Sequence, residues 1–243
     1  MQGKSRQSKA FNEQEKLFVS LAEGVNHAML QLALLSEQAG GMPTDSQSER
    51  WQAVQDISRA SLQLLESYTL MMRLHGGTAE PELEPVALTS VLPETLQLLQ
   101  PYAKQLHVSL EVDVPARLEP VITDRAIMQS ALLSLGQVFI AAQSESGEEN
   151  QVVRLGAHRS RYGVVTGWYS QRMQLTTQAL RRARQLGGWT QQPYGELVSG
   201  PATGVFIADG LLSAVASTLH VARYHNASGL AATLPRCRQL QLV

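Results

Sequence analysis

The sequence predicts an α+β chain in which an antiparallel helical hairpin is followed by an α/β sandwich. Three observations predict this class. Apolar residues recur at helical spacing through residues 11–39 and 48–74, and prolines among acidic residues interrupt that pattern over 78–86. Beyond residue 86, helical and strand-like stretches mix without the strict alternation of a parallel sheet. We therefore expect a helical hairpin domain over 11–77 and a sandwich domain over 84–243.

The first predicted helix carries a seam suited to pairing with other helices. Its apolar residues alternate between spacings of three and four, at Phe18, Leu21, Val25, Ala28, Leu32 and Leu35. The second predicted helix, 48–74, is closed by Gly76 and Gly77. Each arm is about 40 Å long at 1.5 Å per residue. Because such a hairpin has no third element to cover its seam, we expect a homodimer that forms a four-helix bundle.

The predicted elements of the sandwich follow the linker in order. They are a helix over 88–105, a strand over 107–112, a turn at Pro115, a short strand ending at Asp124, a helix over 125–143, strands near 152–158 and 163–169, a helix over 176–186, an apolar helix after Gly204, and strands near 219–224 and 229–234. This order predicts one sheet with helices on one face. The apolar stretch 204–222 contains Asp209 and His220, so we interpret it as a buried helix running into a strand.

Composition and charge limit the classes of partner and the cellular compartment. Lys and Arg number 20 against 21 Asp and Glu, so the chain lacks the net positive field that attracts nucleic acid or an anionic membrane. Cys237 is the single cysteine, which excludes an intramolecular disulfide and favours a reducing compartment. Residues 1–10 are polar and basic, without the apolar region of a secretory signal. We expect a cytoplasmic protein with no metal site and no nucleic acid or membrane partner.

Two segments carry a family resemblance. Residues 85–139 run from a helix through a strand and an aspartate, Asp124, into another helix, and residues 199–236 place a glycine-containing loop before a helix and a terminal strand pair ending in Leu-Pro. With the preceding hairpin, this order resembles the dimerisation/phosphoacceptor and ATP-binding modules of bacterial sensor histidine kinases, from Phe11 onward. The resemblance implies a histidine-kinase-type ATPase-like sandwich. It is similar in particular to degenerate kinases that act as histidine phosphotransferases.

The sequence departs from the family at three parts of the nucleotide pocket. Counted from Asp124, the two metal-binding asparagines of the family fall on Ser134 and Val138, and a valine has no oxygen to ligate magnesium. The adenine-recognising aspartate of the family falls within 167–170, which contains no carboxylate. The glycine-rich loop retains its outer glycines, Gly200 and Gly204, but proline and alanine lie between them. We expect no cofactor, and magnesium-ATP only if the pocket functions despite these changes.

His27 is the candidate phosphoacceptor. It lies midway along the first predicted helix, at the level where the resemblance places the phosphorylated histidine. It precedes the seam position Ala28, so it flanks the seam, where a receiver's aspartyl phosphate can approach in line. The acidic residue that usually follows this histidine is absent. Glu23, one turn earlier, or the adjacent Asn26 can orient the ring instead. The alternative is a surface histidine on a bundle helix.

Structural roles account for the other polar residues of interest. Asp124 is expected to cap the helix that begins at Arg125. The run 181–184 is expected to be the solvated face of a helix, with contact to an acidic partner or phosphate as the alternative. Trp168 and Tyr169 are expected to fill the space of a nucleotide base. Structural roles are also expected for the remaining histidines, His75, His107, His158, His220 and His225.

Three hypotheses of function follow from the resemblance. The first is a two-component phosphotransfer protein whose bundle presents His27 to the receiver domain of a response regulator, without ATP-dependent autokinase activity. The second is a pseudokinase adaptor that binds a receiver or a true histidine kinase and performs no chemistry. The third is an active histidine kinase with an atypical pocket.

Overall fold

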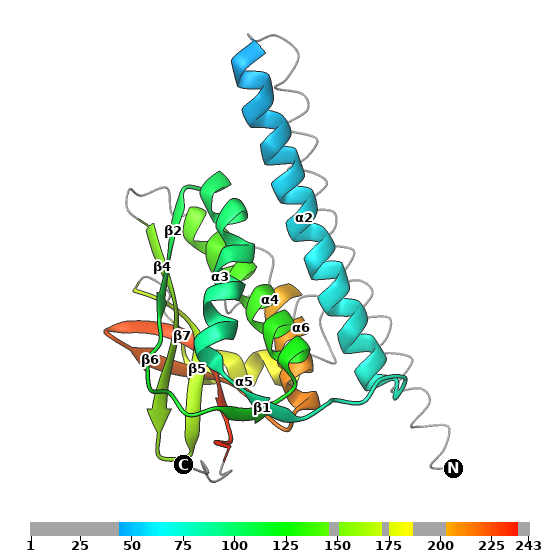
Figure 1. The fold of residues 1–243 in the computed structure, drawn as a ribbon, viewed down its shortest axis with the longest axis vertical. Helices are drawn as coiled ribbons and strands as arrows, with labels where there is room; N and C mark the ends of the chain where they lie inside the picture. Colours follow the sequence, from blue (N-terminus) through cyan, green and yellow to red (C-terminus); the bar gives the residue numbers. More distant parts are fainter. Residues whose placement is uncertain (1–43, 146–150, 172–174, 187–202, 238–243) are drawn as a thin grey trace.

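The computed structural model describes residues 44–145, 151–171, 175–186 and 203–237, and in these a long helix leans against an α/β sandwich (Figure 1). The first predicted helix, with its seam and His27, lies outside the described residues. The second predicted helix is confirmed as α2, Thr44–His75.

A glycine turn ends α2. The amide of Gly76 donates to the Met72 carbonyl at 2.8 Å, and that of Thr78 donates to the Arg73 carbonyl at 2.9 Å. Gly77 adopts a φ of +69°, which a residue without a side chain reaches at no steric cost. The predicted end of the helix at Gly76 and Gly77 is therefore confirmed.

The C-terminal half of α2 packs on the sandwich. Met71 is buried in the main hydrophobic core, and Gln137 from the central helix of the sandwich donates from Nε2 to the Ala60 carbonyl at 2.9 Å. Nearer the N-terminus of α2, the Asp56 carboxylate accepts a hydrogen bond from Gln105 Nε2 at 3.4 Å. These contacts fix α2 over several turns. The domain limits 11–77 and 84–243 remain a prediction.

The predicted linker is partly a strand. Glu84–Val86 forms β1, which pairs antiparallel with β3, Val121–Thr123. The prolines favoured a linker because proline donates no backbone hydrogen bond, but Pro85 sits in a two-stranded ribbon, where an edge position tolerates it. The expectation of a linker over 78–86 was wrong for these last three residues.

A five-stranded mixed sheet forms the sandwich, in the order β2-β4-β5-β7-β6. Only the β2–β4 pair is parallel. The strands are β2 (Val108–Asp113), β4 (Gln151–Ser160), β5 (Gly163–Ser170), β6 (Leu219–Tyr224) and β7 (Ala227–Leu234), and the helices are α3 (Leu88–Gln105), α4 (Arg125–Ser144), α5 (Thr177–Leu186) and α6 (Thr203–Ala214). Helices α3, α4 and α6 lie on one side of the sheet, between it and α2 (Figure 1). The predicted sandwich is confirmed.

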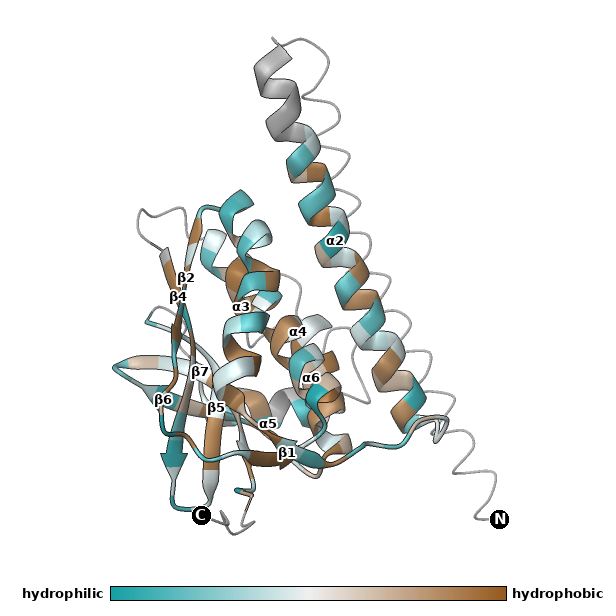
Figure 2. Cartoon of the chain, viewed as in Figure 1, coloured by the Kyte–Doolittle hydropathy of each residue, from teal (hydrophilic) through white to brown (hydrophobic). Residues whose placement is uncertain are grey.

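The central helix α4 is apolar because it is surrounded. Among the described helices it alone is long and apolar enough to cross a membrane, yet 78% of its apolar stretch is buried inside the fold. It contacts α2, α3 and α6 as well as the sheet (Figure 2). Burial on all sides explains an apolar helix without any membrane. The stretch 204–222, interpreted as a helix running into a strand, is confirmed as α6 followed by β6.

Candidate functional site

Asp124 positions the start of α4 and uses both carboxylate oxygens in doing so. Oδ1 accepts from the amide of Ile127 at 3.0 Å, which caps the helix. Oδ2 accepts from the amide of Glu82 at 2.9 Å, which ties the segment after α2 to the sandwich. The predicted capping role of Asp124 is confirmed, and its second bond joins the two parts of the chain.

Ser134 and Val138 lie on the face of α4 that meets α6. They are 1% and 4% exposed. The Ser134 hydroxyl donates to the Ser130 carbonyl within the same helix at 2.9 Å, and Val138 has no polar side-chain atom. Val138 has no oxygen for a cation, and the Ser134 hydroxyl is buried and directed at its own helix.

Gly204, in the first turn of α6, closes directly over these two positions. A Cβ at Gly204 would overlap the Ser134 carbonyl oxygen and lie 2.6 Å from Val138 Cγ2. The two helices therefore touch backbone to backbone where the resemblance places magnesium and phosphate. Gly204 serves here as the small residue of a helix contact. Gly200 lies outside the described residues.

Trp168 fills the interior between β5 and α4. It is fully buried, and its indole Nε1 donates to the Leu132 carbonyl at 2.7 Å. A Cβ at Gly136 would lie 2.7 Å from Trp168 Cζ2, so α4 has a glycine where the indole lies. Tyr169 lies on the opposite face of the sheet and packs with Val165, Ala227 and Ala231. The expectation that both aromatic residues fill one space was wrong, because neighbouring strand residues point to opposite faces.

The end of β5 is joined to α4 by a buried polar pair. Ser170 Oγ donates to Gln143 Oε1 at 2.6 Å, and both residues are buried. Along 167–170, where the resemblance places an adenine-binding aspartate, the side chains are thus a core tryptophan, a tyrosine of the other face and a hydroxyl bonded to α4. None of them is a carboxylate.

Comparison with solved structures finds histidine kinases of similar fold. The Acinetobacter baumannii histidine kinase AdeS gives a TM-score of 0.55 at 11% identity, covering 87% of this chain and 96% of that chain. The histidine kinase ThkA, solved in complex with the response regulator protein TrrA, gives 0.56 at 12% identity, covering 96% of this chain and 64% of that chain. ShkA, solved at full length in complex with AMPPNP, gives a TM-score of 0.55 at 16% identity. The match covers 96% of this chain and 46% of that chain. This chain has the fold of a histidine kinase catalytic core.

The likeness at these identities is one of fold. No protein-family model matches the sequence, and no curated protein matches it. The coverage of 96% of this chain by ThkA extends the match beyond the sandwich to the helical part. The predicted fold class is thereby confirmed.

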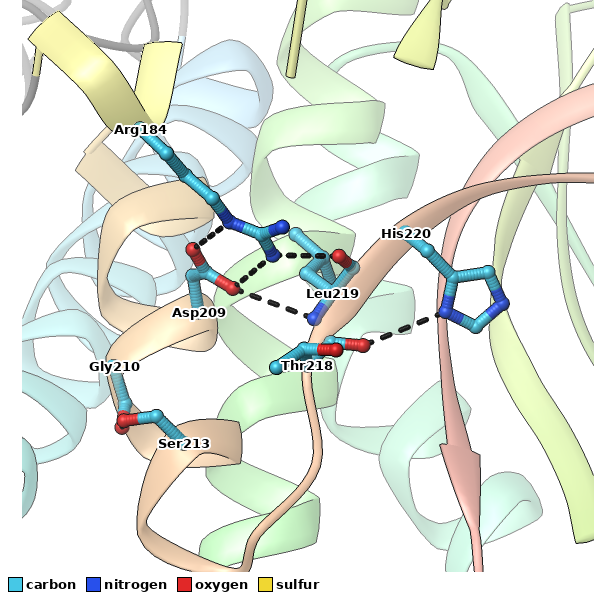
Figure 3. A network of polar contacts seen from close by, with 7 residues as sticks. All are labelled: Arg184, Asp209, Gly210, Ser213, Thr218, Leu219 and His220. Atoms are coloured by element: carbon cyan, nitrogen blue, oxygen red, sulfur yellow. Dashed lines mark hydrogen bonds and ion pairs between the residues drawn. The ribbon is translucent and has the colours of Figure 1, made fainter. Parts of the chain in front are cut away.

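A network that sequence reasoning missed holds α5 in this histidine-kinase-like core (Figure 3). Arg184 donates from Nε and Nη2 to the two carboxylate oxygens of Asp209 on α6, at 2.9 and 2.7 Å. Arg184 Nη2 also donates to the Leu219 carbonyl at the start of β6, at 2.5 Å. Arg181 and Arg184 are exposed, as expected for the run 181–184, but Arg184 in addition joins three elements. An arginine and an aspartate 25 residues apart give no pattern in the sequence.

A second missed cluster lies on the open face of the sheet. The Tyr224 hydroxyl, on the edge strand β6, donates to Asp113 Oδ2 on the opposite edge strand β2 at 2.9 Å. The His158 ring stacks on the Tyr224 ring with centroids 4.9 Å apart, and His225 Nε2 lies 3.3 Å from Asp113 Oδ2. Burial, then the hydrogen bond and charge of Asp113, raise the pKa of Tyr224 to about 12. The hairpin of β6 and β7 is thus fastened across the sheet.

The remaining predicted residues take separate places. His75 ends α2, with Nδ1 2.9 Å from the Met71 carbonyl, and His107 has a φ of +56° in the turn before β2. His220 lies beside Thr218, and its Nδ1 is 3.4 Å from the Thr218 carbonyl oxygen (Figure 3). The structure brings Ser134, Val138 and Gly204 together, while His27 and Gly200 fall outside the described residues.

Proposed function

We propose that this chain is a two-component signalling protein that carries a phosphoryl group on His27 and does not bind magnesium-ATP. The observation that carries the second part is the contact of Gly204 with Ser134 and Val138. A bound triphosphate with its metal would have to separate α6 from α4 at a place where two backbones meet. The fully buried Trp168 adds an obstacle of the same kind at the end of β5.

The phosphoryl group is then supplied by a partner. A receiver aspartyl phosphate is a mixed anhydride, and the imidazole nitrogen of His27 attacks its phosphorus. A P–N bond forms as the P–O bond to the aspartate breaks, and the carboxylate leaves. The complex of ThkA with the response regulator TrrA supports a receiver domain as the partner class. We further propose a homodimer in the cytoplasm, in which a four-helix bundle displays His27, and a true histidine kinase as a further partner.

The exposed side of α2 supports the dimer. Trp51 and Leu62 lie on one side of the helix, eleven residues or about three turns apart, and are 68% and 59% exposed. Gln55 and Arg59 lie between them on this side, so the two are separate exposed apolar side chains that a second helix could cover. In the bundle we expect both to be covered by the second copy.

A phosphotransfer assay tests the proposal. A panel of receiver domains is phosphorylated with radiolabelled acetyl phosphate, purified from the reagent and mixed with the full chain, and in parallel the chain is incubated with magnesium and γ-labelled ATP. We expect label to move from a receiver to the chain, to be acid-labile as phosphohistidine is, and to be absent from His27→Gln.

Each other outcome contradicts a defined part of the proposal. Label arriving from ATP would show an active kinase. Receiver binding that persists in His27→Gln, without label on the wild-type chain, would show an adaptor. A matched control, His107→Gln, changes a histidine of the sandwich and should leave transfer unaltered, because His107 lies in the exposed turn before β2.

A further inference from the structure

We propose that a groove between the β4–β5 turn and the residues after β7 binds an acidic segment of a partner protein. The β4–β5 turn, whose residues Arg161 and Tyr162 line the groove, lies where β4 finishes and β5 begins. The cavity has a volume of about 670 Å³, and its lining includes Glu119, Arg161, Tyr162, Arg236 and Cys237. This surface lies apart from the contact between α4 and α6.

The groove concentrates positive charge in a chain whose net charge is −1. Arg161 and Arg236 line it, and Arg159 lies beside it on β4. Glu119 is the one acidic residue among the described lining residues. Arg159 Nη2 lies 3.6 Å from Glu119 Oε1, and Arg236 Nε lies 3.5 Å from Glu119 Oε2. One carboxylate shared by two arginines, with Arg161 in addition, leaves an excess of guanidinium groups to which carboxylates of a partner can bind.

An exposed tyrosine gives the groove an anchor point. Tyr162 is 80% exposed, the largest value among the exposed large hydrophobic residues, and the Arg161 guanidinium lies 5.6 Å from its ring centroid. Tyrosine and arginine are the residue types that dominate the binding energy of protein interfaces. The aromatic face can pack against an apolar side chain while the arginines pair with neighbouring carboxylates.

The frame of the groove is held by hydrogen bonds that each involve a backbone group. The Tyr162 amide donates to Ser160 Oγ at 3.2 Å, and Arg236 donates to the Ser160 carbonyl. The Cys237 amide donates to the Pro120 carbonyl at 2.8 Å, which fastens the residues after β7 to the segment before β3. A surface built on such fixed elements binds with little loss of conformational freedom.

An acidic protein segment fits this surface better than a nucleic acid. Single strands are bound by a series of aromatic side chains along a charged track, on which successive bases stack. The described lining residues supply one exposed aromatic ring beside two arginines, with Glu119 as a further lining residue. That arrangement matches a short peptide with alternating acidic and apolar residues.

Cys237 gives a direct readout, because it is the single cysteine of the chain and lines the groove. The full chain is alkylated with iodoacetamide, a neutral reagent, with and without a synthetic peptide of alternating glutamate and leucine. We expect the peptide to slow alkylation in a saturable manner, and salt to weaken this protection. In the double variant Arg161→Glu, Tyr162→Ser, the peptide concentration needed for half protection should rise by roughly tenfold or more.

Arg181→Glu is the matched control, since it changes the charge equally at an exposed position on α5. It should leave protection unchanged. Equal protection of wild type and double variant, no protection of the wild type, or protection by oligothymidylate in place of the peptide would each overturn the proposal. The assay uses neither His27 nor ATP, so its result is independent of the proposed phosphotransfer.

Discussion

At the scale of residues, small side chains decide how closely the helices approach. Gly204 and Gly210 both belong to α6, but they face different neighbours. Beyond Gly204 lies the backbone of α4, which cannot move without moving the helix, whereas beyond Gly210 lie Sδ and Cγ of Met71, a buried side chain that can change rotamer. The same added methyl group therefore has different consequences at the two positions.

Gly204→Ala should be destabilising while Gly210→Ala should be close to neutral. At Gly204 the methyl group overlaps the Ser134 carbonyl oxygen, and overpacking of this kind costs about 1–3 kcal/mol. At Gly210 the gain in helix propensity, about 0.5–1 kcal/mol, offsets the displacement of Met71. Urea unfolding at equilibrium measures both. Equal losses would show that α6 does not rest on α4 as described.

His158 should make the free energy of unfolding depend on pH in mild acid. Burial, then the charges of His225 and His220, lower its pKa below the ordinary 6.5. Its Nδ1 is buried without a partner among the described residues, and Glu111, Asp113, Arg154, Tyr169 and Tyr224 complete its charged and titratable surroundings. The unfolded chain then binds a proton that the folded chain does not, so stability falls as the pH drops below about 6.5 and levels off below the folded pKa.

The variant His158→Phe isolates this effect. A phenyl ring keeps the stacking on Tyr224, where the present rings are inclined by 8°, and removes the titration. Thermal unfolding between pH 5 and pH 8 should show a flatter profile for His158→Phe than for wild type. An unchanged slope would place the acid sensitivity in another group.

At the scale of elements, α5 depends on polar contacts that reach across the fold. Leu180 of α5 and Leu175, just before the helix, are buried. Arg184 at the end of α5 bonds to the carboxylate of Asp209 and the carbonyl of Leu219. Arg184 is 35% exposed in its side chain and Asp209 is 15% exposed. Partial shielding from water makes this pair stronger than an ordinary surface salt bridge.

Arg184→Lys should loosen α5 while the rest of the sandwich stays folded. A lysine keeps the charge but cannot donate to both carboxylate oxygens and to the Leu219 carbonyl in the planar geometry of a guanidinium group. Hydrogen exchange should accelerate in Thr177–Leu186 and change little in α4. Arg181→Lys, an exposed position on the same helix, serves as the control. Exchange equal in the two variants would mean that the network does not hold α5.

At the scale of the whole molecule, local patterns predicted more than long-range contacts. The helix expected over 88–105 is α3 with the same bounds, because its apolar period is a local signal that holds although Pro93 and Pro101 lie inside the helix. The strand β1 was missed because its partner lies beyond α3 and β2, and the Tyr224–Asp113 bond joins residues 111 apart. At the site, the sequence predicted departures from the family at Ser134 and Val138. It did not indicate that α6 closes over α4, since a glycine in a loop motif and a glycine in a helix contact look alike.

The measurement that tests the central claim most directly is calorimetric titration of the full chain with magnesium-ATP, with a histidine kinase of known ATP affinity run alongside. We expect no saturable heat and no rise in melting temperature, because Gly204 contacts Ser134 and Val138 at the positions where the resemblance places the metal and phosphates. Stoichiometric binding of magnesium-ATP, accompanied by thermal stabilisation, would contradict it.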